Sequence, residues 1–232
     1  MKVSYHVYKD VKIDHAGTTD EEILQGSKKN AAKIRKLRYS FVCLGHHARR
    51  RKLFLGAPNA SGDLLVEFDL DKRKFTSCGF QDSGLAEPND SKIHKGLLVD
   101  EERDAVYFGT ATLSPLAKLI DARGGSLVRY DIAKRKFSRL ANPTPSDYYQ
   151  GTTWDLGRGK VYLFTDRNMF AVYDLRKKKL IRYVSMESIP HTGCLDDAGG
   201  VWGTYSTSQH AFYRYDPDKN RFEFPKSALP DA

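Results

Sequence analysis

The chain has 232 residues, of which 40% are hydrophobic and 12% aromatic, enough apolar side chain to bury a core in one large domain or two small ones. Intrinsic disorder is therefore not the expected state of a chain with this composition. Charged residues make up 29%, the mean hydropathy is −0.56, and no apolar run approaches the length of about 18 residues that a membrane-spanning helix needs, so we expect a soluble protein. The formal net charge of +9 suits an anionic partner, but the positions of the charges matter more than their sum.

The beginning of the chain and its cysteines bear on the cellular compartment. Residues Met1 to Asp10 lack the basic-then-apolar pattern of a secretion signal, which predicts a cytoplasmic protein or one whose leader lies outside this sequence. The three cysteines, Cys43, Cys78 and Cys194, are far apart and have no CxxC spacing. We therefore expect reduced thiols, with neither a disulfide framework nor a zinc site.

Residues 1–37 differ in pattern from the rest and form a separate N-terminal segment. Lys2 to Tyr8 alternates like a strand, and a helix is predicted from Thr19, where Thr19 and Glu22 form a capping box. One face of this helix carries the residues Ile23, Ser27, Ala31, Ile34 and Leu37, and the other carries Lys28, Lys29, Lys33, Arg35 and Lys36. Two interpretations remain open: the helix packs on the following domain with its basic side in solvent, or it binds nucleic acid.

A repeat begins after this segment. The repeated motif is a tripeptide that follows an alternating apolar run: an aromatic residue, an Asp, and an apolar or turn residue. In each copy a further apolar residue comes six positions after the Asp. The four copies are Phe68-Asp69-Leu70 with Phe75, Tyr130-Asp131-Ile132 with Phe137, Tyr173-Asp174-Leu175 with Leu180, and Tyr215-Asp216-Pro217 with Phe222. We interpret each copy as a strand, a turn capped by its Asp, and a returning strand.

A second set of hairpins alternates with the first. The strands of these hairpins are predicted at 97–100 with 105–108, 152–155 with 160–164, and 193–196 with 200–205. Two hairpins in each period give four strands, and the repeated Asp recurs at intervals of 62, 43 and 42 residues, close to the roughly 40 to 50 residues of a propeller blade. The long interval contains an insertion at 111–125.

The predicted fold class is therefore all-β, a β-propeller with about four visible four-stranded blades and an N-terminal helix. The blades occupy about 38–93, 94–149, 150–190 and 191–232. They form either a complete small propeller or part of a larger one, and a homodimer could complete an incomplete ring.

Three polar residues enter the predicted inner strands of successive units: His94, Gln150 and His191. In a propeller these positions surround the central channel at one face. The side chains could bond to nearby backbone carbonyls, hold a divalent metal, or bind a ligand and carry out acid–base chemistry. His46 and His47 in the first unit are further candidates for this set.

Other residues on that face could complete a site. Tyr149, which follows Tyr148, is a candidate base, so His94, His191 and Tyr149 are the predicted catalytic residues. Arg123 in the insertion and Arg167 are candidates to neutralise a substrate carboxylate, and with Gln150 they are the predicted ligand-binding residues.

The basic surplus is concentrated elsewhere, in the turns between the third and fourth strands of the units. These turns contain Lys72 to Lys74, Lys134 to Lys136, Arg176 to Lys179, and Lys219 with Arg221, and we expect them on the face opposite the histidines. They form either a solvated face or a polyanion-binding one. No aromatic residues lie among the turn lysines, which disfavours nucleic acid as a partner.

The segment His191 to Trp202, with the pattern His-x3-Leu-Asp-x-x-Gly-Gly-Val-Trp, is similar to the repeated unit of virginiamycin B lyase-like propellers. The set His94, Gln150 and His191 resembles the manganese ligands of oligogalacturonate lyases. The resemblance implies a lyase acting on polyuronates or lactones, with Mn, Mg or Ca as the candidate cofactor.

The predicted function is therefore a lyase-like propeller that binds a sugar acid, an oligosaccharide or a similar small anionic ligand at the channel mouth, without a membrane partner. The alternative is a non-catalytic scaffold that binds a protein or polyanion.

Overall fold

The computed structural model describes residues 41–58, 63–114, 119, 121–186, 193–205 and 211–224. Their strands form four antiparallel four-stranded sheets, named here blades 1 to 4. Blade 1 contains β1 (Cys43–His47), β2 (Lys52–Gly56), β3 (Leu65–Asp69) and β4 (Lys74–Ser77). Blade 2 contains β5 (Leu98–Asp100), β6 (Ala105–Gly109), β7 (Leu127–Asp131) and β8 (Lys136–Ala141). Blade 3 contains β9 (Tyr149–Asp155), β10 (Lys160–Thr165), β11 (Met169–Asp174) and β12 (Lys179–Ser185), and blade 4 contains β13 (Gly193–Leu195), β14 (Val201–Tyr205), β15 (Ala211–Asp216) and β16 (Arg221–Glu223).

Each blade is a meander, because every strand pairs with its neighbour in the sequence. The repeated Asp shapes the turn as predicted: Asp69 accepts backbone N–H bonds from Asp71 and Lys72 at 3.0 and 2.8 Å. Asp216 makes the same two bonds in blade 4. The residue four positions after the Asp adopts a left-handed conformation in every copy, namely Arg73, Arg135, Lys178 and Asn220 with φ of 49 to 51°. This short-range chemistry brings each third strand back as the fourth.

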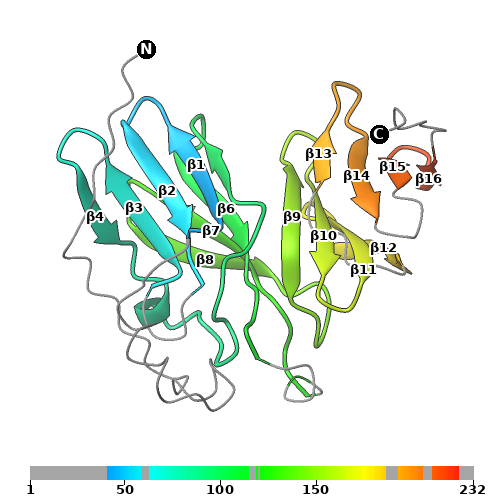
Figure 1. Cartoon of the computed structure of the whole chain (residues 1–232), viewed down its shortest axis with the longest axis horizontal. Coiled ribbons are helices and arrows are strands. Elements are labelled where there is room, and N and C mark those ends of the chain that lie inside the picture. The colour runs from blue at the N-terminus through cyan, green and yellow to red at the C-terminus, as the bar shows by residue number, and fades with distance from the viewer. Residues whose placement is uncertain are drawn as a thin grey trace, which may run out of the picture.

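The core lies between the blades. Phe54 of blade 1 packs with Tyr130 and Phe137 of blade 2, Tyr107 of blade 2 packs with Trp154 of blade 3, and equivalent apolar clusters join blade 3 to blade 4. Figure 1 shows blades 1 and 2 on the left and blades 3 and 4 on the right. The sheets pack face to face in chain order, which confirms the all-β propeller architecture with four four-stranded blades.

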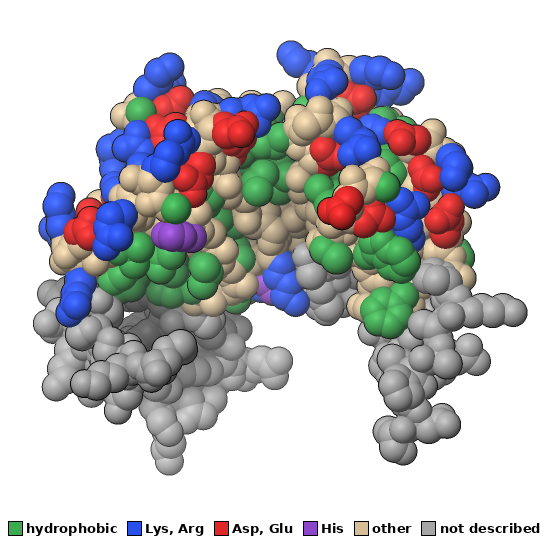
Figure 2. Space-filling view, turned by 90° about the horizontal axis from the view of Figure 1, so that it is seen from above, with side chains coloured by type: hydrophobic (Ala, Val, Ile, Leu, Met, Phe, Trp, Pro, Cys, Tyr) green, Lys and Arg blue, Asp and Glu red, His purple; other side chains and the backbone are tan. Residues whose placement is uncertain are grey.

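The four blades form an arc. Strand β1 packs beside β5, β6 beside β9, and β9 beside β13, but no contact of similar extent joins β13 to β1 among the described strands. Figure 2, which looks down on the tight turns, shows an arch with a concave side between the first and last blades.

Further predictions concern the N-terminal segment, the insertion, the cysteines and membrane spans. The strand at Lys2 to Tyr8, the helix from Thr19 and the whole segment 1–37 lie outside the described residues. The predicted insertion at 111–125 falls between β6 and β7. Cys43, Cys78 and Cys194 are free thiols in the structure. Within the described ranges, no helix combines the length and apolar character that a membrane span requires.

Candidate functional site

The two ends of the blades differ. One end, called here the turn face, carries the tight turns 48–51, 70–73, 101–104, 132–135, 156–159, 175–178, 196–200 and 217–220. The opposite end, the loop face, carries longer connections, including 78–97 between blades 1 and 2 and 142–148 between blades 2 and 3. His94 and Gln150 lie where inner strands leave the loop face, so the basic turns are on the opposite face as predicted.

Two of the three residues predicted at the channel mouth, His94 and Gln150, are in contact. His94 Nδ1 lies 2.7 Å from Gln150 Oε1, although 56 positions separate them in the sequence. Because the amide oxygen can only accept, Nδ1 carries the proton of this bond. The chain around His94 is held against β9: the Thr152 N–H donates to Lys95 O at 3.0 Å and the Trp154 indole N–H donates to Gly96 O at 3.0 Å.

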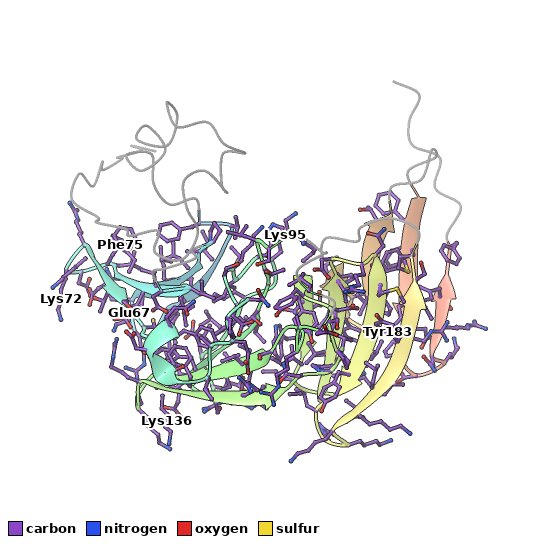
Figure 3. The ribbon with its side chains drawn as sticks, turned by 90° about the horizontal axis from the view of Figure 1, so that it is seen from below. Glu67, Lys72, Phe75, Lys95, Lys136 and Tyr183 are labelled. Carbon is purple, nitrogen blue, oxygen red and sulfur yellow. The ribbon has the colours of Figure 1, made fainter. Side chains whose placement is uncertain are left out.

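Two lysines flank His94. Burial lowers the pKa of the half-buried Lys92, the positive charge of Lys95 lowers it further, and Cys43 opposes this shift. No ion pair joins Lys92 or Lys95 to a carboxylate within the described ranges. Figure 3 places Lys95 on the concave side of the arch, between the two pairs of blades. Two ammonium groups that no described carboxylate pairs with, on the segment that carries His94, favour an anion.

The third predicted mouth residue, His191, lies outside the described residues. No group of three or more His, Cys, Asp or Glu residues suited to a metal occurs in the part of the chain that the structure describes. His94 and Gln150 alone bring one imidazole and one amide, and the lysines beside them repel a cation. The described residues therefore do not fit the divalent metal that the resemblance to lyases implies.

Tyr149, a predicted catalytic residue, lies in the core. Its side chain is 1% exposed, and its hydroxyl lies 3.2 Å from Thr144 Oγ1. Burial raises the pKa of this phenol far above its ordinary value. A buried phenol that holds its proton this strongly does not support the predicted role as a base.

Two of the three predicted ligand-binding residues, the arginines, pair with carboxylates of the loops that connect the blades. Arg123 Nη1 lies 3.0 Å from Glu87 Oε1, and Arg167 Nε lies 3.4 Å from Asp147 Oδ1. Asp147 also accepts a hydrogen bond of 2.6 Å from the Tyr183 hydroxyl. No hydrogen bond or ion pair between described residues connects either arginine to His94 or Gln150.

The suggestion that His46 and His47 join the mouth is wrong. Both are at the end of β1 that reaches the turn face. His47 is buried, its Nε2 lies 3.1 Å from Asp104 Oδ1, and its Nδ1 accepts the Arg50 N–H at 3.3 Å. His47 therefore joins the turns of blades 1 and 2.

Opposite charges alternate on the turn face (Figure 2). Basic side chains pair there with turn carboxylates: Arg50 with Asp104, Arg51 with Asp71, Arg103 with Asp100, Arg158 with Asp155, and Lys219 with Asp216. Such exposed pairs are individually weak. Their alternation nevertheless favours a solvated face over a continuous polyanion-binding one.

Lys92 and Lys95 are not among the site residues that the sequence predicted. The signal was present in the run Lys92-Ile93-His94-Lys95, which has no acidic residue within it. The basic turns contain many more lysines and arginines than this run. Nothing in the sequence shows which lysines are paired with carboxylates.

Comparison with known proteins supports the fold. No family model and no curated protein matches the sequence. The chain is similar to the extracellular domain of the putative one component system BT4673 from B. thetaiotaomicron, with a TM-score of 0.56, 20% identity, and coverage of 80% of this chain and 22% of that one. It is also similar to U3-55K, with a TM-score of 0.57, 7% identity, and coverage of 81% of this chain and 52% of that one.

A third similar structure is the extracellular domain of the putative hybrid two component system BT3049 from B. thetaiotaomicron, with a TM-score of 0.54, 13% identity, and coverage of 78% of this chain and 22% of that one. This chain thus spans between about a fifth and about half of the structures it matches. Identities this low show a shared β-propeller fold and nothing about shared function. The resemblance to lyase propellers stays a prediction.

Proposed function

We propose that this chain binds a small anionic ligand of the sugar-acid class at the loop-face mouth. The observation that carries the proposal is the pair Lys92 and Lys95, which no described carboxylate neutralises. Most other basic groups near the loop face, such as Arg123 and Arg139, already pair with Glu87.

The chemistry of the neighbouring groups suits a hydroxylated acid. The ammonium groups would bind the carboxylate through charge-assisted hydrogen bonds. The amide oxygen of Gln150 takes part in the bond to His94, which leaves the amide N–H groups as donors to ligand oxygens. Since this bond fixes both side chains, the polar groups are held in place before a ligand arrives.

Ligand binding alone is proposed here, and a lyase reaction would need an additional group. Proton abstraction needs a base at the mouth, and Tyr149 is buried. His94 is the candidate that remains among the described residues, because an imidazole can act as a general acid or base.

Calorimetric titration at low salt tests this proposal, with galacturonate as the probe and neutral galactose as the control ligand. The variant Lys92→Gln/Lys95→Gln should bind galacturonate at least about 10-fold more weakly, because each hydrogen bond to a charged group contributes roughly 1.5 to 3 kcal/mol. The matched control is Lys134→Gln/Lys136→Gln, which removes the same charge from the turn face and should change affinity less than about 2-fold.

Equal losses in the two variants would show that net charge and not the mouth attracts the ligand, and would overturn the proposal. Galactose binding as tight as galacturonate binding would also overturn it. Elemental analysis of the same samples measures metal content. A stoichiometric metal that is lost in His94→Ala would replace the anion site by the metal site of the lyase resemblance.

A further inference from the structure

The backbone of Lys92 is fixed between the first two blades. Its N–H donates to Ala111 O at 3.1 Å, and its carbonyl accepts the Ala111 N–H at 2.7 Å. On its other side, Lys92 forms a β-bridge with Pro58, and the next N–H, that of Ile93, donates to Ala57 O at 3.2 Å. Ala57 and Pro58 follow β2 of blade 1, and Ala111 follows β6 of blade 2. The side chain of Lys92 therefore starts from a point of the loop face that two blades hold in place.

Lys95 is fixed three residues further on, against blade 3. Its carbonyl accepts the Thr152 N–H at 3.0 Å, and the residue forms a parallel β-bridge with Gly151 of β9. These backbone contacts keep the side chains of Lys92 and Lys95 in the same part of the loop face. No ion pair joins either lysine to a carboxylate among the described residues. The fold therefore holds two like charges near each other without an acidic partner.

Two effects raise the fraction of Lys92 that is uncharged. Burial of this half-buried side chain lowers the pKa of its ammonium group, and the positive charge of Lys95 lowers it further. A thiolate at Cys43 would oppose this shift, but burial raises the pKa of Cys43 to about 11, so the thiol is neutral at pH 7. A partly desolvated lysine beside a second cation is the environment in which proteins use the uncharged amine as a nucleophile.

We propose that Lys92 forms a covalent imine with the aldehyde of an open-chain uronic acid. This inference rests on the proposed function, because Lys95 binds the carboxylate while Lys92 reacts. The lone pair of the uncharged amine attacks the carbonyl carbon, so that a C–N bond forms and the C–O bond breaks. The oxygen leaves as water with one proton from the amine and one from solvent, and no oxidant or reductant is needed. The product is a protonated imine, which keeps the positive charge that the ammonium group had.

The imine gives the site an electron-withdrawing group of its own. A protonated imine draws electrons from the adjacent carbon and makes the hydrogen on that carbon more acidic, which is how lysine imines divide a difficult reaction into easier steps. The described residues do not fit a metal ion that could polarise the ligand instead. The ligand class is thereby narrowed from sugar acids in general to those that also carry an aldehyde.

Reductive trapping tests this inference directly. The full-length protein is incubated with galacturonate and cyanoborohydride, which reduces an imine to a stable secondary amine, and peptide mass spectrometry measures the rate of labelling at each lysine. Lys92 should be labelled at least about 10-fold faster than Lys136, because a carboxylate bound at Lys95 places the aldehyde beside the amine. Lys136 is exposed on the turn face and serves as the internal reference.

Three variants separate the roles of the two lysines. Lys92→Arg keeps the positive charge but cannot form an imine, so it should lose the label while it still binds galacturonate in calorimetry. Lys95→Gln removes the neighbouring charge and should slow the labelling of Lys92 by galactose, an aldehyde sugar without a carboxylate, whereas Lys95→Arg should restore it. Lys134→Gln removes a charge from the turn face and should leave the labelling of Lys92 unchanged. Circular dichroism confirms that each variant is folded.

The outcomes distinguish this inference from the proposed function. Galacturonate that binds in calorimetry but labels Lys92 no faster than Lys136 overturns the imine and leaves the anion site standing. Labelling of Lys92 that is as fast with galactose as with galacturonate overturns the recognition of the carboxylate, while the reactivity of the amine stands. Labelling by galactose that is equal in Lys95→Gln and wild type overturns the role of the Lys95 charge.

Discussion

Gly96 is the residue whose replacement should disturb the loop-face mouth most. Its φ is +97°, and a Cβ at this position would lie 1.9 Å from Thr152 O and 2.5 Å from Thr152 N, both backbone atoms of β9. In Gly96→Ala the segment must move away from β9. This movement breaks the bonds from Thr152 N–H to Lys95 O, from Thr152 Oγ1 to Gly96 O, and from the Trp154 indole to Gly96 O. At about 1 kcal/mol net for each bond, the clash lowers the free energy of unfolding by about 3 kcal/mol.

A second glycine isolates this clash from the intrinsic strain of a left-handed alanine. Gly79 has φ of +84° but nothing within 4 Å of its Cβ position, so Gly79→Ala carries only the strain of about 1 to 2 kcal/mol. At about 2 to 4 °C per kcal/mol for a chain of this size, Gly96→Ala should melt about 6 to 12 °C below Gly79→Ala. Differential scanning calorimetry measures both midpoints. Equal midpoints would refute the reasoning that Gly96 is required by its close approach to β9.

Three further predictions concern burial and pH. Burial raises the pKa of Asp90 to about 6, so between about pH 4 and 6 the folded state keeps a proton that the unfolded chain has lost, and stability should fall as pH rises through this range. Urea unfolding of Asp90→Asn should show a smaller fall in stability. Wild-type and variant stabilities that fall in parallel with pH would contradict this. The pKa of Asp216 is lowered to about 2, mainly by the backbone N–H of Lys219 and further by the Lys219 side chain and the Asp218 N–H. The wild-type protein should therefore lose stability as pH falls from about 4 to 2. In thermal melts over this pH range, Asp216→Asn should lose less stability than wild type. Phe170→Ala should lower the free energy of unfolding by about 3 to 5 kcal/mol in chemical denaturation, because the ring is fully buried. Ile181→Ala, on an exposed strand, should lower it by less than about 1 kcal/mol. Similar losses in the two variants would argue against the interface between blades 3 and 4.

The sequence by itself determined the repeating unit. The spacing from Asp69 to Phe75 and its three copies predicted the third and fourth strands of every blade, and the alternating hairpins predicted the first two strands of blades 2 to 4. These features depend on contacts between residues that are close in the sequence: an Asp that accepts N–H bonds from its own turn, and a left-handed residue that reverses the chain. The strand number, strand order and most boundaries of blades 2 to 4 therefore follow from the sequence.

The candidate site could be predicted only in part. The inner-strand pattern predicted that His94 and Gln150 share a face, and they are in hydrogen-bond contact. The same pattern could not show that Tyr149, the next residue to Gln150, points into the core. It also could not show that Arg123 and Arg167 are paired with Glu87 and Asp147, because those partners are far away in the sequence.

Only the tertiary structure decided which charges are paired among the described residues and how the four blades form an arc. Lys92 and Lys95 look like the turn lysines in the sequence, yet the turn lysines have capping carboxylates nearby, such as Asp216 for Lys219. The arc likewise depends on how each sheet rotates against the next, which is set by side chains packing between blades. Such contacts join residues that are far apart in the sequence, as between Tyr107 and Trp154, and local propensity carries no information about them.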